Sequence, residues 1–227
     1  MNEETAVELS IVNPVVKEFL NQKYRPADQR LLCFREIGER NLVPIILKET
    51  ESVLSMLLKL TRPDKILEIG TAIGYSAAFF AYSCPDAEIY SIEKDDNSFR
   101  IAGKNIEAAG LEGQVHLYHG DGEDEIRRMG KEGINGFDLV FIDAGKSHYR
   151  RFLDAALTVS SDHAVIISDN ILIHGLTVTA DRDPKNKHKT HMRKMREYLD
   201  YICSNPRFDT TLMAVGDGMA VSLLQTT

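Results

Sequence analysis

Two carboxylates and an amide occur where they could share one divalent cation. Asp143 ends a short apolar segment, and the pair Asp169-Asn170 ends the next one. Two carboxylate oxygens and an amide oxygen form a hard-oxygen set that suits Mg²⁺, which prefers octahedral oxygen ligands and keeps some of its waters. An Asp-Asn pair is also common in simple turns. We favour the metal because adjacent strands of one sheet would bring Asp143 beside the pair.

Lys146 follows Asp143 by three residues and could supply a base. A lysine after a strand is usually solvated. Beside a hydroxyl that a metal polarises, it would instead accept the hydroxyl proton as general base. The rest of the catalysis would then be the positioning of the oxygen for in-line attack.

A glycine-rich segment upstream has the features of a cofactor loop. Residues 68–76 read EIGTAIGYS, in which Gly70 and Gly74 let the backbone turn tightly and approach a ligand closely. This GxxxG spacing differs from the GxGxxG dinucleotide fingerprint, because Ala72 stands where a pyrophosphate needs a glycine. A ligand without phosphate fits better, although such a turn can be merely structural.

Two further acids complete the cofactor prediction. Glu93 ends the second expected strand, where an acid binds a ribose diol in folds of this kind. Asp121, followed by Gly122, comes after the third expected strand and could accept from an adenine amino group. A glycine loop, a ribose acid and an adenine acid together indicate S-adenosylmethionine.

The spacing of apolar residues predicts an α/β fold with a doubly wound, Rossmann-like and mostly parallel sheet. The turn Gly216-Asp217-Gly218 predicts a C-terminal hairpin that adds antiparallel strands. Each expected parallel strand has an acid at or just beyond its end, where ligands bind in open α/β sheets. We expect parallel strands at residues 66–69, 89–92, 115–118, 139–142 and 165–167, hairpin strands at 208–213 and 219–224, and helices at 76–83, 96–109, 124–129, 148–158 and 192–204. The five acids are Glu68, Glu93, Asp121, Asp143 and Asp169.

The segment before this alternating pattern has helical spacing throughout. Residues 1–62 are therefore predicted to form an N-terminal helical cap, and residues 63–227 the catalytic domain, packed as one structural unit. Pro63 cannot continue a helical hydrogen-bond ladder, so it marks the end of the cap.

Composition limits the class of protein. The 227 residues are 43% hydrophobic and 27% charged, which is ordinary for a soluble globular chain. No apolar segment is long enough to span a membrane, and the first twenty residues lack the pattern of a secretory signal. Cys33, Cys84 and Cys203 form no CxxC pair, so we expect no disulfide framework, no zinc cluster and a cytoplasmic location.

The charge is unevenly distributed. The net charge of −7 argues weakly against a general nucleic-acid binder. Residues 182–196, however, contain seven Lys or Arg against a single Asp, and they follow the Asp169-Asn170 pair closely enough to overhang the active site. Clustered cations neutralise phosphates, although an isolated charge run is more often a solvated helix face. The candidates for substrate contact are Arg182, Lys185, Lys187, Lys189 and Arg193.

From about Val43 to its end, the chain resembles the cation-dependent O-methyltransferases related to the catechol and caffeoyl-CoA enzymes. The likeness rests on residues 68–76, Glu93, Asp121-Gly122, residues 137–143 with Lys146 and Tyr149, and Asp169-Asn170. The resemblance implies that the methyl donor is surrounded by Val43, Glu68, Gly70, Ser76, Glu93, Asp121, Gly122 and Asp143. It implies that Asp143, Asp169 and Asn170 hold Mg²⁺, that Lys146 is the base, and that the protein is a homodimer.

One departure affects the expected substrate. Catechol enzymes place a tryptophan just before the catalytic lysine, whereas Gly145 stands there in this chain, which has no tryptophan. The chain is more similar to a bacterial branch that methylates 5-hydroxyuridine in transfer RNA. That likeness rests on Leu42-Val43-Pro44-Ile45, Met195-Arg196-Glu197-Tyr198-Leu199 and Gly216-Asp217-Gly218.

We therefore expect a Mg²⁺-dependent O-methyltransferase that converts 5-hydroxyuridine in the anticodon loop of transfer RNA to 5-methoxyuridine. The base offers two adjacent oxygens to one cation, and unpaired loop bases can be splayed into a pocket. The alternative is a small-molecule O-methyltransferase for catechol-like vicinal hydroxyls. A non-catalytic RNA-binding module that holds S-adenosylmethionine is a third hypothesis, which the intact Lys146 and the complete ligand set oppose.

Overall fold

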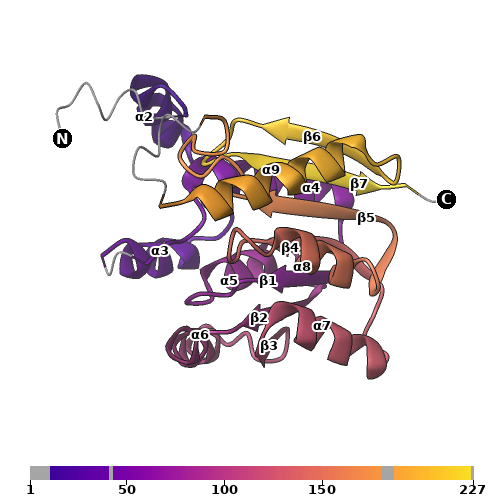
Figure 1. Ribbon diagram of the computed structural model, residues 1–227. Coiled ribbons are helices and arrows are strands. Elements are labelled where there is room, and N and C mark those ends of the chain that lie inside the picture. The colour runs from indigo at the N-terminus through magenta and orange to yellow at the C-terminus, as the bar shows by residue number, and fades with distance from the viewer. Residues whose placement is uncertain (1–10, 41–42, 180–186, 226–227) are drawn as a thin grey trace.

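The computed structural model describes residues 11–40, 43–179 and 187–225, which form a mixed sheet with helices on both faces (Figure 1). Seven strands lie in the order β3-β2-β1-β4-β5-β7-β6. The strands are β1 (Lys65–Ile69), β2 (Glu88–Glu93), β3 (Val115–His119), β4 (Phe137–Ile142), β5 (Ser160–Asp169), β6 (Phe208–Met213) and β7 (Met219–Leu224). The helices are α2 (Pro14–Lys23), α3 (Arg30–Arg40), α4 (Lys48–Thr61), α5 (Tyr75–Ser83), α6 (Asp96–Ala108), α7 (Gly122–Lys131), α8 (Tyr149–Ala156) and α9 (Lys189–Ser204).

The predicted sheet is confirmed. Strands β1 to β5 pair in parallel, and β7 is antiparallel to both β5 and β6. The order reverses between β1 and β4, so the carboxyl ends of these two central strands flank the position where open α/β sheets bind their ligands.

The core lies in two layers, one on each face of the sheet. Alternate residues of β4 show this, because side chains of a strand point to opposite faces in turn. Leu139 and Phe141 pack in the layer that includes side chains of α4, α5 and α6, whereas Val140 and Ile142 pack in the layer that includes side chains of α7, α8 and α9. All four are fully buried, which explains why the segment is apolar without alternation.

One strand is much longer than its sequence pattern suggests. Strand β5 was expected over residues 165–167, but it begins at Ser160. Its first residues are polar and partly exposed, so they carry no apolar signal. They form a strand nevertheless, because Ser160 pairs with Phe137 of β4 ahead of a register shift in that ladder.

The N-terminal helices differ in how deeply they join the core. Leu54 and Leu58 of α4 and Leu31 of α3 are buried in the layer that covers one face of the sheet, whereas α2 has no buried residue. Helix α4 ends as expected, with Arg62 in the left-handed conformation before Pro63. Because α3 and α4 share the core of the sheet, the described part of the N-terminal segment packs directly on the catalytic domain.

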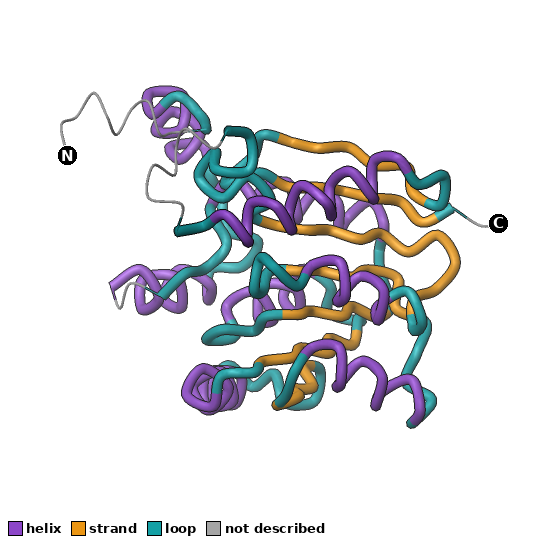
Figure 2. The backbone as a smooth tube through the Cα atoms, viewed as in Figure 1, coloured by secondary structure: helices purple, strands orange, loops and turns teal. Residues whose placement is uncertain are grey.

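The loops that follow the parallel strands all lie at one end of the molecule (Figure 2). The N-terminal helices α2 and α3 lie beyond the same end (Figure 1). Among the described residues, no helix combines the length and the apolar character that crossing a bilayer would need.

Candidate active site

A cavity of about 450 Å³ lies at the carboxyl ends of the parallel strands. Eight of the residues predicted for the site contribute to its wall: Gly70, Ser76, Glu93, Asp121, Gly122, Asp143, Lys146 and Asn170. The predicted residues Val43, Glu68 and Asp169 are not part of the wall, although the neighbours Pro44, Ile45 and Ile46 of Val43 are.

The glycine loop closes against the loop that carries Asp143. Gly70 has a φ of 106°, and a Cβ atom at this position would lie 2.0 Å from the carbonyl oxygen of Asp143. Only glycine permits both this left-handed conformation and this backbone approach. The cofactor loop and the chemical loop are therefore in direct contact across β1 and β4.

Glu93 is fixed by two backbone amides. Its Oε2 atom accepts from the Ala72 amide at 2.8 Å, and its Oε1 atom accepts from the Asp95 amide at 2.8 Å. These bonds tie the end of β2 to the glycine loop. A carboxylate held in this way keeps free lone pairs that can accept from the hydroxyls of a ribose.

Asp121 is more constrained than its sequence context suggested. Both carboxylate oxygens accept from the guanidinium of Arg151 at 2.9 and 2.8 Å, and one also accepts from Lys94 Nζ at 3.1 Å. Asp121 additionally caps α7 by accepting from the Glu123 amide at 3.2 Å. The hydrogen bonds from Arg151 contribute most to lowering the pKa of Asp121 to about 2. Arg151 and Lys94 thus form part of the cavity wall beside the predicted adenine acid.

Lys146 lies at the meeting point of the predicted chemical groups. Its Nζ atom donates to Asp143 Oδ1 at 2.9 Å, to Asn170 Oδ1 at 3.1 Å and to the Tyr149 hydroxyl at 2.8 Å. The Tyr149 hydroxyl donates in turn to the backbone oxygen of Asp169 at 2.7 Å. Residues from the ends of β4 and β5 and from the first turn of α8 therefore hold one amine in place.

Asp169 lies directly beneath this cluster and is fully buried. Its Oδ1 atom accepts from the Asn170 amide at 2.8 Å, whereas Oδ2 has no hydrogen-bond donor among the described residues. Burial, and secondarily the charge of Asp143, raise the pKa of Asp169 to about 7. Within the described ranges, no three His, Cys, Asp or Glu side chains lie so that they could hold a metal together. The predicted ligand set is not such a group, because it consists of two acids and the amide of Asn170.

The C-terminal hairpin turn holds the loop that carries Asn170. The amides of Ile171 and Leu172 donate to the backbone oxygens of Gly218 and Asp217, each at 3.0 Å. The His174 amide donates to the Asp217 carboxylate at 2.7 Å. These bonds fix a loop in which Asn170 itself has a left-handed φ of 54°. The Gly216-Asp217-Gly218 turn thereby supports the site from the neighbouring strand β7, whose beginning pairs with the carboxyl end of β5.

Glu68 lies behind the glycine loop, within β1 and not beyond its end. It is fully buried and accepts from the Ser91 hydroxyl, which also contacts the Thr71 hydroxyl. Burial raises the pKa of Glu68 to about 7, against the opposing effect of the Ser76 and Ser91 hydroxyls. This geometry indicates that Glu68 supports the glycine loop. Direct contact of Glu68 with the donor stays a prediction.

The raised pKa of Glu68 predicts a pH-dependent stability. The folded state retains the proton up to about pH 7, whereas the unfolded carboxyl loses it near its ordinary value of 4.5. The contribution of Glu68 to the free energy of unfolding therefore falls as the pH rises between these two values, by up to about 3 kcal/mol. We expect Glu68→Gln to lose less stability than the wild type between pH 5 and pH 8 in urea unfolding. Parallel losses in the two proteins would contradict the buried-acid interpretation.

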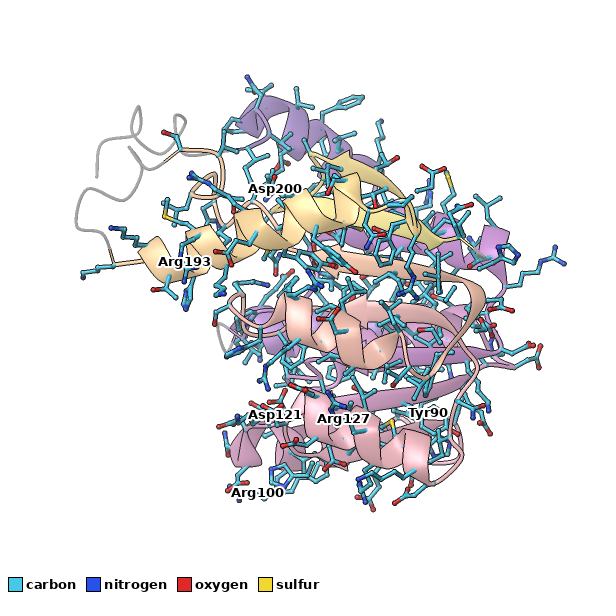
Figure 3. The ribbon with its side chains drawn as sticks, turned by 45° about the vertical axis from the view of Figure 1, so that its right-hand side comes forward. Tyr90, Arg100, Asp121, Arg127, Arg193 and Asp200 are labelled. Carbon is cyan, nitrogen blue, oxygen red and sulfur yellow. The ribbon has the colours of Figure 1, made fainter. Side chains whose placement is uncertain are left out.

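The structure describes only some of the basic residues that were predicted to contact the substrate. Arg182 and Lys185 lie outside the described residues, Lys187 lies just before α9, and Lys189 begins this helix. Arg193 lies near the beginning of α9 and Asp121 at the beginning of α7, on the same side of the molecule (Figure 3). Arg193 and Lys194 both form ion pairs with Glu197, which reduces the positive charge that this face presents.

Two site residues carried no recognisable role in the sequence. Tyr149 was noted only as part of a family likeness, yet it links Lys146 to Asp169. Arg151 gave no signal, because its partner Asp121 lies 30 residues earlier in the chain. The separation of only three residues could have suggested the contact of Lys146, in the turn before α8, with Tyr149 at the beginning of α8. The Arg151 contact instead needs the packing of α8 against α7.

Comparison with known proteins gives a consistent family. The family described as O-methyltransferase matches residues 34–224. A catechol O-methyltransferase of Niastella koreensis is 30% identical over 205 residues, which cover 87% of this chain and 90% of that protein. A caffeoyl-CoA O-methyltransferase of Populus kitakamiensis is 28% identical over 171 residues, covering 74% of this chain and 73% of that protein.

Solved structures agree with this result. A Staphylococcus aureus protein, solved as a candidate caffeoyl-CoA O-methyltransferase, superposes with a TM-score of 0.86 at 26% identity, covering 92% of this chain and 99% of that chain. An O-methyltransferase of Bacillus cereus, solved in complex with S-adenosylhomocysteine, shares the fold with a TM-score of 0.80 at 24% identity, covering 93% and 97% of the two chains. The chain therefore belongs to the O-methyltransferase family and is an S-adenosylmethionine-dependent O-methyltransferase of the catechol and caffeoyl-CoA type.

Proposed function

We propose that this O-methyltransferase is Mg²⁺-dependent and methylates one of two neighbouring oxygens of its substrate. The observation that carries the proposal is the position of Lys146 Nζ, within 3.1 Å of oxygens of both Asp143 and Asn170. A potential base therefore lies directly beside two of the three predicted metal ligands. This is the arrangement that metal-assisted deprotonation of a hydroxyl requires.

The side chains at this position fit a hard divalent cation. Oxygens of Asp143 and Asn170 lie close together, since both accept from Lys146 Nζ, and the buried Asp169 Oδ2 lacks a donor within the described part of the chain. All three groups offer oxygen, which Mg²⁺ prefers. Bound by these three residues, Mg²⁺ would act as a Lewis acid that polarises a substrate hydroxyl.

Different residues of the chain carry out the separate tasks of the proposed reaction. Glu93 accepts from the ribose of the donor, and the glycine loop brings the donor against the Asp143 loop. Lys146 accepts the hydroxyl proton at Nζ, while Tyr149 fixes the amine in position. The substrate oxygen forms a bond to the methyl carbon as the bond from that carbon to sulfur breaks. Bringing these groups together supplies much of the rate enhancement.

Within this chemistry, 5-hydroxyuridine in transfer RNA is the substrate that we favour. Its hydroxyl and ring carbonyl provide the two adjacent oxygens, and an unpaired loop base can enter a pocket. Gly145 stands where a catechol enzyme has an aromatic clamp. The beginning of α9 carries Lys189 and Arg193, and Arg193 lies on the same side of the molecule as Asp121 of the cavity wall. Cations at this position would contact phosphates of the RNA.

A small molecule with vicinal hydroxyls is the second candidate. It is favoured by the relatives described above, which are named for catechol and caffeoyl-CoA substrates. The pairing of Arg193 and Lys194 with Glu197 also favours it, because a cation already neutralised by a carboxylate attracts phosphate less strongly.

Methyl transfer from labelled donor distinguishes the two candidates. The substrates are bulk transfer RNA that carries 5-hydroxyuridine and a panel of catechols, each with and without EDTA. We expect labelled RNA, and the loss of nearly all transfer after chelation with recovery when Mg²⁺ is restored. Labelling of the catechols alone would exclude the RNA substrate, and full activity after chelation would exclude the metal role.

Removal of charge at the beginning of α9 tests the RNA contact separately. We expect the double variant Lys187→Ala with Lys189→Ala to weaken binding of transfer RNA and to reduce the salt dependence of binding, by about one unit of slope for each lost phosphate contact. Binding of S-adenosylhomocysteine should not change. Filter binding at several salt concentrations and calorimetry measure the two affinities. An equal loss of both would mean that the segment serves the fold and not the substrate.

A homodimer is a further part of the proposal. Large apolar side chains are exposed on α2, α4 and the β6–β7 hairpin, among them Val15, Met56, Leu60 and Leu212. Exposed apolar surface often marks a protein interface. Sedimentation at about twice the mass of the 25.5 kDa chain would support a dimer of two copies, whereas a single-chain mass at micromolar concentration would contradict it.

A further inference from the structure

A buried carboxylate collects hydrogen bonds from three separate elements close to the donor cavity. Glu51 of α4 is 1% exposed, and it accepts from Arg35 of α3 at 2.6 Å and from the Tyr75 hydroxyl of α5 at 2.6 Å. The Tyr24 hydroxyl, from the link between α2 and α3, donates to the same carboxylate at 2.5 Å. Burial raises the pKa of Tyr24 to about 12, so its hydroxyl remains a donor.

The same guanidinium also reaches the cavity wall. The Arg35 Nη2 atom that contacts Glu51 donates a second bond, at 3.0 Å, to the backbone oxygen of Ile46. Ile46, with Pro44 and Ile45, forms the wall of the cavity that comes from the N-terminal segment. Arg35 is 4% exposed, so this bond lies out of contact with water and is not weakened by it.

A second contact of α3 supports the same wall. Gly38 lies three residues after Arg35, and a Cβ atom there would be 3.3 Å from Ile45 and 3.4 Å from Ile73. Both isoleucines contribute to the cavity. Because residues three apart share a helix face, one face of α3 holds Ile45 through packing and Ile46 through a hydrogen bond. Residues 43–47 form no regular element, so these contacts largely determine where the wall lies.

We infer that Arg35 is a positioning residue for the methyl donor, which acts by fixing residues 44–46 as the N-terminal wall of the donor cavity. Glu51 supplies the buried counter-charge that keeps Arg35 in place, and Tyr75 connects this pair to the helix that follows the glycine loop. The described N-terminal helices thus have a role in donor binding, which their position in the sequence does not reveal. The inference rests on the cavity being the donor site.

Two matched variants test this role. Arg35→Lys keeps a positive charge but loses the rigid guanidinium plane that directs Nη2 to both Glu51 and the Ile46 carbonyl. Tyr24→Phe removes a different partner of Glu51 and leaves the Ile46 bond in place. We expect Arg35→Lys to raise the dissociation constant of S-adenosylhomocysteine, measured by calorimetry, by about tenfold, the effect of losing one hydrogen bond from a charged group. Tyr24→Phe should leave this constant within about twofold of wild type.

Two further readouts separate positioning from general loss of structure. We expect Arg35→Lys to raise KM for the donor with little change in kcat at saturating donor, because Arg35 does not contact the reacting groups. In hydrogen–deuterium exchange, S-adenosylhomocysteine should protect residues 43–47 in the wild type and in Tyr24→Phe but not in Arg35→Lys. Equal donor affinity in both variants, or equal protection, would overturn the inference.

A third variant covers the case in which Arg35→Lys does not fold. The double variant Arg35→Met with Glu51→Leu removes both buried charges together, and such replacements are often tolerated or stabilising. It still removes the bond to Ile46, so the same rise of about tenfold in the dissociation constant is expected. An unchanged constant would overturn the inference. If the wild type itself bound no S-adenosylhomocysteine, both the donor assignment of the cavity and this inference would fail.

Discussion

Replacing Lys146 with methionine is expected to lower kcat by about 10²- to 10⁴-fold, the usual contribution of a positioned general base. The amine contacts Asp143, Asn170 and Tyr149 and therefore lies with the chemical groups of the cavity. Methionine keeps much of the length of the side chain but cannot accept a proton. The dissociation constant of the donor should stay within about threefold of wild type. Turnover with labelled donor and calorimetry with S-adenosylhomocysteine measure the two quantities.

Lys94→Met is the matched control for this prediction. Lys94 contributes to the same cavity wall, but its Nζ atom contacts Asp121 at 3.1 Å. Its loss should affect the donor KM modestly and leave kcat almost unchanged, because the Lys94 side chain is largely exposed and Asp121 keeps its bonds from Arg151. If both lysine variants lost turnover equally, the loss would be explained by the positive charge in the cavity and not by a general base. A Lys146→Met enzyme within about tenfold of wild-type kcat would exclude the base role.

Gly70→Ala is expected to have the largest effect on the structure of the site. A Cβ atom would lie 2.0 Å from the Asp143 carbonyl oxygen, and the residue would keep a φ of 106° that alanine rarely adopts. Left-handed strain and steric overlap together are expected to destabilise the protein by roughly 3–5 kcal/mol. The clash involves the residue that begins the Asp143 loop, so donor binding should be lost even at temperatures where the variant remains folded. Urea unfolding and calorimetry with S-adenosylhomocysteine measure these effects.

Gly133→Ala separates the effect of left-handed strain from the effect of the steric clash. Gly133 also has a left-handed φ, of 78°, but nothing lies within 4 Å of a Cβ atom at this position. The change should therefore show the conformational strain alone, at about 1–2 kcal/mol, with donor affinity unchanged. A Gly70→Ala protein no less stable than Gly133→Ala would mean that the contact of the glycine loop with the Asp143 loop is not needed.

The sheet was predictable because its signal is local. Strands buried on both faces must be largely apolar, and residues 139–142 of β4 show this pattern after the partly buried Asp138. The signal fails where burial is incomplete, as at the polar beginning of β5, which forms a strand only because β4 offers it a partner. The hairpin strands β6 and β7 were predicted with their observed bounds, since a Gly-Asp-Gly turn between two short strands is a strong local signal.

The set of acids was predictable, but their individual positions were not. Glu93, Asp121 and Asp143 face the cavity as expected, whereas Glu68 is buried behind the glycine loop. The reason is that Glu68 lies inside β1, where alternation of side chains directs it to the face covered by α5. A shift of one or two residues along a strand decides between the cavity and the core, and residue spacing does not resolve such a shift.

The sequence by itself determined the chemistry that is available, because an acid near the end of each parallel strand, a glycine loop and a lysine after Asp143 are local features of the chain. The tertiary structure alone decided which groups meet. Lys146 with Asn170, Arg151 with Asp121 and Arg35 with the Ile46 carbonyl are contacts between different elements. Each exists because helices pack on the sheet in one arrangement, and burial then makes these hydrogen bonds specific.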